Sequence, residues 1–302
     1  MKVVDLFCGC GGLSLGFTMA GFDVVAAYDN WKIALDTYRL NFKHKAVMLD
    51  LKNVEQSISV IRNDELDMII GGPPCQDFSS AGKRDEDNGR GDLTVCFAEI
   101  VGKIRPRWFV MENVERIVKT NKLQQAKAIF RQAGYGMSQT VLNASLCNVP
   151  QKRKRFILIG AIGEKDGFMD AILAHNQAKR PMTVADYLGD SLGIEFYYRH
   201  PRSYARRGIF SIHEPSPTIR GVNRPIPQGY QIKHNDPVKS IEGVRPLTTI
   251  ERSYIQTFPK TFQFLGSKTE IEQMIGNAVP VNLGRYVAVA IREYLETNNP
   301  VC

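Results

Sequence analysis

The sequence lacks the features that mark membrane and secreted proteins. No apolar run approaches the ~20 residues needed to cross a bilayer. The N-terminal stretch MKVVDLFCGC has no signal-peptide pattern, because Asp5 interrupts a very short apolar run. There is also no internal repeat and no low-complexity tail. We therefore expect a globular cytoplasmic protein that does not bind a membrane.

Cysteine is scarce, with six residues scattered over the chain and no CxxC pair. Cys8 and Cys10 have no second pair of ligands nearby, so we expect no metal site. In a reducing compartment the cysteines should be free thiols. Cys96 and Cys147 look like packing residues.

The composition is ordinary for a globular protein, with 302 residues of which 43% are hydrophobic and 23% charged. The formal net charge is +8. A basic protein tends to bind polyanions, but basic residues also serve solubility. Charge alone therefore favours a nucleic-acid partner only slightly.

Short apolar strands alternate with helical segments through the first half of the chain. The expected strands are 2–7, 22–28, 45–50, 67–71, 107–114 and 155–162. This alternation predicts an α/β fold, a wound and largely parallel sheet with helices on both faces. From about Lys179 the chain becomes loop-rich, and a helical pattern resumes near the end. We predict one domain from 1–180 and 269–302, and a smaller domain from 181–268.

Several reactive side chains fall at strand ends, where ligands bind in such sheets. Asp29 and Asp50 each end a strand, and the turn CGCGG stands between a strand and a helix. The turn brings backbone N–H groups to a ligand, although its glycine spacing is not G-x-G-x-x-G. A carboxylate at Asp29 can accept hydrogen bonds from ribose hydroxyls, and Asp50 can contact a base. Together these residues favour a nucleoside cofactor over solvated strand-end acids.

Cys75 and Glu112 are the candidates for chemistry. Cys75 follows GGPP at the border of a strand and a polar loop, where a thiolate can be exposed and activated. Glu112 ends the apolar run WFVM, where burial can raise a carboxyl pKa and suit a general acid. A structural glutamate is the alternative. In QKRKR, alternation places Gln151, Arg153 and Arg155 on one face.

Six segments, in this order, resemble the motifs of the DNA (cytosine-5)-methyltransferases, particularly the compact bacterial enzymes of restriction–modification systems. The segments are DLFCGCGGLSLGF, GGPPCQDFSSAGK, MENV, LNASLCNVPQKRKRFILIG, VRPLTTIERSYIQTFP and QMIGNAVPVNLGRYVAVAI. The resemblance implies a Rossmann-like S-adenosylmethionine-dependent methyltransferase domain and a target-recognition domain, which would be 181–268.

The resemblance also implies roles for residues. Cys75 would attack C6 of a flipped-out cytosine, and Glu112 would hydrogen-bond N3 and the exocyclic amine. Arg155 and Arg153 would steady the base and the adjoining phosphate. S-adenosylmethionine would be the methyl donor and S-adenosylhomocysteine the product. The residues at cofactor-side positions are Phe7, Gly9, Gly11, Gly12, Leu13, Asp29, Asn30, Asp50, Leu51, Pro73 and Asn277.

Double-stranded DNA is the partner that the resemblance implies, bound by a monomer. A restriction endonuclease acting separately on the same site fits this setting. Basic and polar residues of the loop after Cys75 and of the recognition region are the candidates for DNA contact. They are Ser79, Lys83, Arg84, Arg90, Thr218, Arg220, Asn223 and Arg224.

Some positions depart from the family's pattern, and three other interpretations stay open. Cys147 and Asn148 stand where many relatives have Tyr and Gly, Asp29 where Glu is common, and Ile219 where Leu is usual. A tRNA methyltransferase on the same scaffold would carry a Cys-Phe-Thr segment, which is not found. A catalytically silent DNA-binding protein has no need of Cys75, Glu112 and Arg155 together. A nicotinamide oxidoreductase is disfavoured by the glycine spacing.

Overall fold

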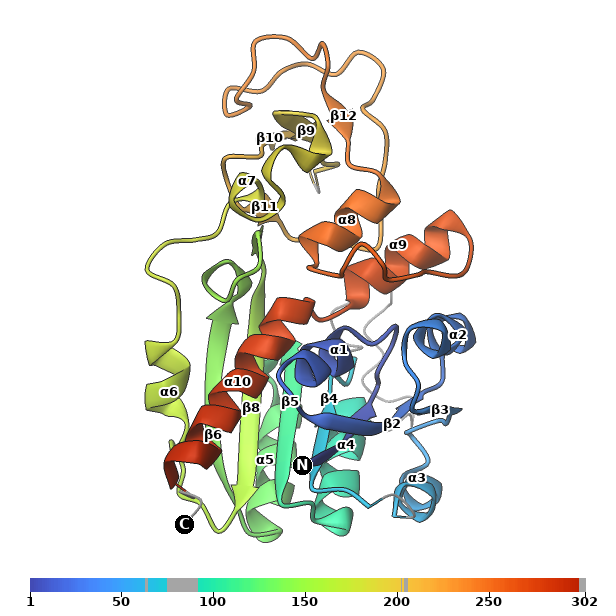
Figure 1. Cartoon of the computed structure of the whole chain (residues 1–302), viewed down its shortest axis with the longest axis vertical. Coiled ribbons are helices and arrows are strands. Elements are labelled where there is room, and N and C mark those ends of the chain that lie inside the picture. The colour runs from blue at the N-terminus through green and yellow to red at the C-terminus, as the bar shows by residue number, and fades with distance from the viewer. Residues whose placement is uncertain (63–64, 75–91, 202, 204–205, 299–302) are drawn as a thin grey trace.

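We describe the protein from a computed structural model, and the description covers residues 1–62, 65–74, 92–201, 203 and 206–298. A seven-stranded sheet forms its centre, in the order β3-β2-β1-β4-β5-β8-β6 (Figure 1). The strands are β1 (Lys2–Leu6), β2 (Asp23–Asp29), β3 (Lys45–Met48), β4 (Met68–Gly71), β5 (Trp108–Val114), β6 (Tyr135–Asn143) and β8 (Lys154–Ile162). The first five are parallel, and β8 lies antiparallel between β5 and β6. The predicted α/β fold with a mixed, mostly parallel sheet is confirmed.

Each predicted strand is present, with ends that differ by at most two residues. The sequence analysis did not predict β6. Its residues YGMSQTVLN mix glycine, serine and glutamine with apolar residues, so neither a buried run nor a clean alternation stands out. Pairing with β8 along its whole length supplies the hydrogen bonds that make it a strand.

Helices cover both faces of the sheet. They are α1 (Gly12–Met19), α2 (Lys32–Asn41), α3 (Val54–Ile61), α4 (Leu93–Ile104), α5 (Asn121–Gln132), α6 (Asp170–His175) and α10 (Val281–Asn298). Successive residues of β4 point to opposite faces. Met68 and Ile70 belong to the hydrophobic cluster of α1 and α10, whereas Ile69 belongs to that of α4 and α5. Burial on both faces explains why the parallel strands are almost wholly apolar.

The stretch Lys268–Asn298 is long and apolar enough, by length and composition, to cross a membrane. However, 67% of its apolar window is buried inside the molecule. Leu283, Val287 and Ile291 of α10 pack into the core cluster that lies against the sheet. The apolar face of this helix is therefore explained by packing within the protein.

A smaller part of the chain stands above the sheet in Figure 1. It contains α7 (Val184–Leu188), the 3-10 helix Gly189–Leu192, β9 (Phe196–Tyr198), β10 (Ile209–Ser211), β12 (Arg245–Pro246) and α8 (Thr249–Ile255). The strands pair in the order β10-β9-β12. Tyr197, Leu247 and Ile255 belong to a hydrophobic cluster of this part.

Helix α9 (Lys268–Asn277) joins the two parts. Its Ile275 packs into the cluster of the smaller part, while Met274 packs with Cys10 and Ala34 beside α1 and α2. Strand β11 (Ser216–Pro217) also pairs with β7 (Gln151–Lys152), next to the large sheet. Because these elements contact both parts, the boundary at 268/269 stays a prediction.

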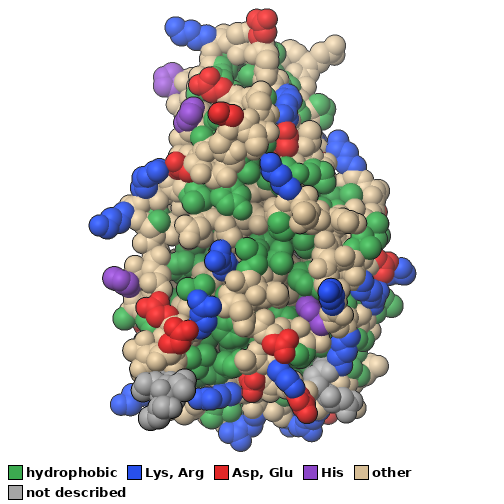
Figure 2. All heavy atoms as spheres, viewed as in Figure 1, with side chains coloured by type: hydrophobic (Ala, Val, Ile, Leu, Met, Phe, Trp, Pro, Cys, Tyr) green, Lys and Arg blue, Asp and Glu red, His purple; other side chains and the backbone are tan. Residues whose placement is uncertain are grey.

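Lysine and arginine side chains do not gather on the face shown in Figure 2. They are spread over the face, many of them near its outline, and are interspersed with acidic side chains, while most of the middle of the face is hydrophobic or uncharged. The net charge of +8 therefore does not mark this face for a polyanion.

Candidate active site

A cavity of about 430 Å³ opens at the carboxyl ends of β1, β2, β4 and β5. This size falls within the ~300–1,000 Å³ range of small-molecule sites. Its wall contains every predicted cofactor residue except Gly11. They are Phe7, Gly9, Gly12, Leu13, Asp29, Asn30, Asp50, Leu51, Pro73 and Asn277. Glu112, Arg153 and Arg155 line the same cavity. The fold thus brings the predicted cofactor side and the predicted catalytic side together.

The glycine turn between β1 and α1 shapes one wall. Phe7 and Gly9 have positive φ values of 59° and 52°, and a Cβ added to Gly9 would meet nothing within 4 Å. This open, turned backbone leaves room for a ligand. Gly12 allows close packing of the chain, because a Cβ added there would lie 2.2 Å from the Val279 carbonyl oxygen. Gly11 faces Phe42 and Tyr38 instead, which explains its place outside the cavity wall.

Asp29 holds this turn in place. Its Oδ2 accepts a hydrogen bond from the Gly9 N–H and its Oδ1 one from the Trp31 N–H, both at 2.8 Å. Burial raises the pKa of Asp29, and the backbone donors limit the rise. A carboxylate has about four acceptor sites, so this one can still accept from a ligand hydroxyl besides its backbone donors. Asp50 is exposed on the opposite side and accepts from the Lys52 N–H at 3.1 Å.

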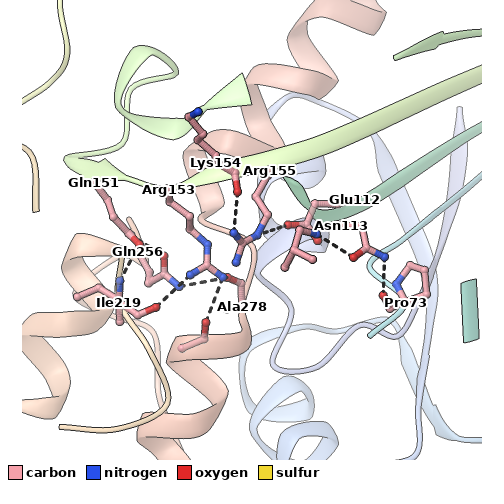
Figure 3. A network of polar contacts seen from close by, with 12 residues as sticks. Pro73, Glu112, Asn113, Gln151, Arg153, Lys154, Arg155, Ile219, Gln256 and Ala278 are labelled. Carbon is pink, nitrogen blue, oxygen red and sulfur yellow. Dashed lines mark hydrogen bonds and ion pairs between the residues drawn. The ribbon is translucent and has the colours of Figure 1, made fainter. Parts of the chain in front are cut away.

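Glu112 and Arg155 form a buried ion pair across β5 and β8. Arg155 Nε lies 2.8 Å from Glu112 Oε1, and the antiparallel register brings the ends of both strands to the cavity (Figure 3). Burial raises the pKa of Glu112, and the nearby Arg155 opposes the rise. Gly72 allows close approach, since a Cβ there would lie 3.1 Å from Glu112 Oε2.

Asn113 is a residue of this site to which the sequence analysis gave no role. Its Nδ2 donates to the Pro73 carbonyl at 3.0 Å, and its Oδ1 accepts from the Val114 N–H at 2.8 Å. Both side-chain groups are buried. Asn113 therefore fixes the segment that leads directly to position 75. The signal was present in MENV, where a polar residue follows a buried glutamate.

Arg153 contacts the protein's own backbone. Its guanidinium donates to the carbonyls of Ile219 at 3.0 Å, Gly276 at 3.1 Å and Ala278 at 3.2 Å (Figure 3). These contacts favour a positioning role over the predicted contact with the base. The expected alternation is confirmed, because Gln151, Arg153 and Arg155 point inward while Lys152 and Lys154 are exposed.

Gln151 makes a second connection beside Arg153. Its Oε1 accepts from the Ile219 N–H at 2.9 Å, and its Nε2 donates to Gln256 Oε1 at 2.8 Å. Gln256 in turn donates to the Ala278 carbonyl at 3.1 Å. The network in Figure 3 therefore links the smaller part of the chain to the end of α9 and to the cavity.

The predicted nucleophile lies outside the described residues. The same is true of Ser79, Lys83, Arg84 and Arg90, the predicted DNA contacts of the loop. The described chain ends at Pro74 and resumes at Asp92. Pro74 and Leu93, near the two ends of this gap, both line the cavity.

The predicted base-reading residues differ in whether their side chains bind the protein's own backbone or are exposed. Thr218 Oγ1 donates to the Lys152 carbonyl at 2.7 Å, and Asn223 Nδ2 to the Leu247 carbonyl at 2.8 Å. Arg220 donates to the His200 carbonyl. Arg224 is exposed. Thr218 and Asn223 thus act within the fold here, which the local sequence gave no means to foresee.

The described cysteines are all free and buried. They are Cys8, Cys10, Cys96 and Cys147. Burial raises the pKa of Cys10 and of Cys147 to about 12, so both stay protonated near neutrality. None of these is a reactive thiol, and the prediction that Cys96 and Cys147 are packing residues is confirmed.

Comparison with known proteins gives consistent results. The family model described as C-5 cytosine-specific DNA methylase matches residues 1–293. The chain is 60% identical over 293 residues to type II methyltransferase M.HindV of Haemophilus influenzae, covering 96% of each protein. It is 54% identical to type II methyltransferase M.HgiDI of Herpetosiphon aurantiacus, covering 98% of this chain and 95% of that one. Among solved structures, S. pombe Dnmt2 methyltransferase superposes with a TM-score of 0.68 at 16% identity, covering 99% of each chain, which shows a shared fold.

Proposed function

Because the chain belongs to the family of C-5 cytosine-specific DNA methylases and is a DNA (cytosine-5-)-methyltransferase, we propose that it methylates one cytosine in a short duplex sequence through a flipped base and a covalent bond to Cys75. One observation supports this most directly. The buried Glu112–Arg155 pair lines the same cavity as the glycine turn and as Pro74, the residue directly before Cys75.

Cytosine C5 is a weak nucleophile, and covalent addition at C6 makes it stronger. In the proposed reaction the Cys75 thiolate forms a bond to C6, the C5–C6 π electrons shift to form a C4–C5 double bond, and the C4–N3 π electrons take up the proton of Glu112 at N3. The resulting enamine carbon C5 would take the methyl group, which the donor releases from its sulfur. Loss of the C5 proton to a base and of the Cys75 thiolate from C6 restores the C5–C6 double bond, and the N3 proton returns to Glu112. The target base must leave the duplex for this, which costs a few kcal/mol.

Glu112 suits the role of acid. Its burial keeps a larger protonated fraction near neutral pH than an exposed glutamate would have. Arg155 holds the carboxyl in one orientation from 2.8 Å. Arg153 acts indirectly. Its guanidinium keeps the smaller part of the chain against the cavity by donating hydrogen bonds to three backbone carbonyls.

The methyl donor of C-5 DNA methyltransferases is S-adenosylmethionine, which supplies an electrophilic methyl group when bound. We propose that Asp29 accepts the ribose hydroxyls, because its carboxylate is already fixed at the cavity wall. The open turn at Phe7 and Gly9 receives the remainder of the donor, opposite Pro73 and Asn277. S-adenosylhomocysteine is the product.

Double-stranded DNA would be bound between the two parts of the chain. Lys83, Arg84 and Arg90 are proposed to contact phosphates, and the exposed Arg224 remains the best candidate for a base. We further propose a monomer that acts in the bacterial cytoplasm, alongside a restriction endonuclease that cuts the same unmethylated site.

The first test is expression in a host without cytosine methylation, followed by bisulfite sequencing of its DNA. We expect protected cytosines at one short motif. Duplexes carrying 5-fluorocytosine at that motif should then form a covalent adduct at Cys75, found by peptide mass spectrometry. Cys75→Ser should abolish both results and Cys96→Ser neither. Uniform conversion by a folded protein would contradict the proposal, and RNA bisulfite sequencing would then test the tRNA alternative.

A further inference from the structure

A row of hydrogen bonds connects the cavity wall with the surface through α1 and α2. Asp5 of β1 is fully buried and forms part of the wall. Ser14 Oγ donates to Asp5 Oδ2 at 2.5 Å, and Tyr38 OH donates to Ser14 Oγ at 2.7 Å. Tyr38 OH also lies 2.6 Å from His44 Nε2. His44 is half-buried, so the row reaches solvent.

The hydrogens of this row all point toward Asp5. Since the hydroxyls of Tyr38 and Ser14 each donate inward, Tyr38 accepts from Nε2–H of His44. A proton can then pass along the row in one direction. Ser14 gives its hydrogen to Asp5, Tyr38 replaces it, and His44 replaces that of Tyr38. His44 takes a proton from solvent at Nδ1 in exchange. The hydroxyls and the imidazole are then neutral as before, and Asp5 has lost its negative charge.

Asp5 has little in its surroundings to hold a negative charge. Its Oδ1 has no hydrogen-bond partner among the described residues. Its neighbours across the parallel strands are Ala27 and Ile70, which are apolar. Burial, with a smaller contribution from the negative charge of Asp29 at the end of β2, raises the pKa of Asp5 to about 7, although the hydrogen bond from Ser14 limits the rise.

The remaining titratable groups around Asp5 are neutral. The Cys8 thiol of the glycine turn and the Tyr38 hydroxyl of α2 both have raised pKa values, through burial first and the charge of Asp5 second for Cys8. Burial lowers the pKa of His44 at the far end of the row. Asp29 and Glu112 also line the cavity and have pKa values raised by burial, so the Asp5→Asn variant described below is needed to separate their titration from that of Asp5.

The two ligands of the proposed reaction differ in the methyl group on sulfur and in the charge that it gives the sulfur. S-adenosylmethionine carries a positive sulfonium, and S-adenosylhomocysteine has a neutral thioether in its place. We propose that Asp5 makes the site distinguish donor from product by charge: it is ionised beside the cationic donor and takes up a proton through Ser14, Tyr38 and His44 when the neutral product is bound. This inference rests on the proposed function.

The consequence is a preference that depends on pH. The donor binds better when Asp5 is ionised. Below about pH 7, Asp5 must therefore release a proton when the donor binds, and the affinity for the donor falls. Product binding carries no such requirement. The ratio of product to donor dissociation constants should therefore rise by up to about tenfold between roughly pH 6 and pH 8. All groups shared by the two ligands cancel in this ratio.

Isothermal titration calorimetry of the full chain tests this. Each ligand is titrated at several pH values in paired buffers of different ionisation heat, which counts the protons exchanged. We expect proton release with the donor and not with the product. Sinefungin, which bears an ammonium in place of the sulfonium, should behave as the donor does, because charge and not the methyl group is what Asp5 senses.

Two variants complete the experiment. Asp5→Asn should bind both ligands with a ratio independent of pH, whereas Asp36→Asn, an acid of α2 in a surface ion pair, should keep the wild-type pattern. A wild-type ratio that is constant with pH overturns the inference, whether or not Asp5→Asn folds. A ratio that still depends on pH in Asp5→Asn also overturns it, by assigning the effect to Asp29 or Glu112. Failure of the wild type to bind either ligand would instead contradict the proposed function.

Discussion

Glu112 and Arg155 show how neighbouring antiparallel strands form an ion pair from residues 43 positions apart in sequence. Only 14% of the Arg155 side chain and 9% of the Glu112 side chain are exposed. The carboxyl is therefore held at one orientation with a pKa raised by burial. In the proposed reaction, this single carboxyl group supplies the proton.

Glu112→Gln should keep the shape of the side chain and remove its acidic proton. Turnover should fall by about 10²–10⁴-fold, the usual contribution of a general acid, with DNA affinity little changed. Methyl transfer under single-turnover conditions gives the measurement. Glu115→Gln is the matched control, since Glu115 forms an exposed ion pair with Lys154. Equal losses in both variants would mean that Glu112 has no special role.

Asp5 makes a prediction about stability in the absence of ligand. Its pKa is raised in the folded state from 3.8 to about 7, so the native protein binds more protons than the unfolded chain between these values. Stability should therefore fall as pH rises through this window, by on the order of 4 kcal/mol. Urea denaturation of Asp5→Asn should show a flatter pH dependence and a more stable protein at pH 8. A slope equal to that of the wild type would count against the raised pKa.

At the scale of elements, the turn between β1 and α1 depends on how closely α1 approaches the chain before α10. The Val279 carbonyl oxygen occupies the space where a side chain at Gly12 would begin. The turn can bring its backbone to a ligand only because this packing fixes it from behind.

Gly12→Ala should destabilise the protein, because the methyl group forces the backbone of Val279 away. We expect a loss of about 1–3 kcal/mol, as for other overpacked sites, and weaker binding of the methyl donor. The control is Gly163→Ala, which has a positive φ but nothing within 4 Å and so carries only backbone strain. Thermal unfolding and donor titration measure both effects. If Gly12→Ala binds the methyl donor as tightly as the wild type, the conformation of this turn does not contribute to donor binding.

At the scale of the whole molecule, Arg153 holds the smaller part against the sheet. Arg153→Met fills a similar volume but removes the donor from the buried carbonyls of Ile219 and Gly276, while the Ala278 carbonyl keeps its bond from Gln256. Each unsatisfied group costs about 1–3 kcal/mol, so we expect destabilisation of several kcal/mol. Lys152→Met, at an exposed neighbouring position, should have little effect. If Arg153→Met has the same unfolding free energy as the wild type yet loses activity, a direct contact of Arg153 with DNA becomes the better explanation.

The fold followed from the sequence where strands were apolar and separated by helices. The cavity residues were also predictable, because acids and glycines at strand ends meet at one edge of a parallel sheet. What was missed depends on distant partners. The sequence around β6 does not predict its pairing with β8, and the sequence around Asn223 does not predict its hydrogen bond to the Leu247 carbonyl. The role of Arg153 depends on carbonyls 66 to 125 residues away.

The connection between the two parts is made partly by main-chain groups. Gln151 and Arg153 bind Ile219, Gly276 and Ala278 through backbone N–H and C=O groups, which nearly every amino acid supplies. A substitution at the surface of the smaller part would leave these bonds in place, whereas a change at Gln256 or Ile275 would alter side-chain contacts of the same connection. If the smaller part reads the DNA as proposed, its exposed residues could be exchanged there while the residues of the cavity stay as they are.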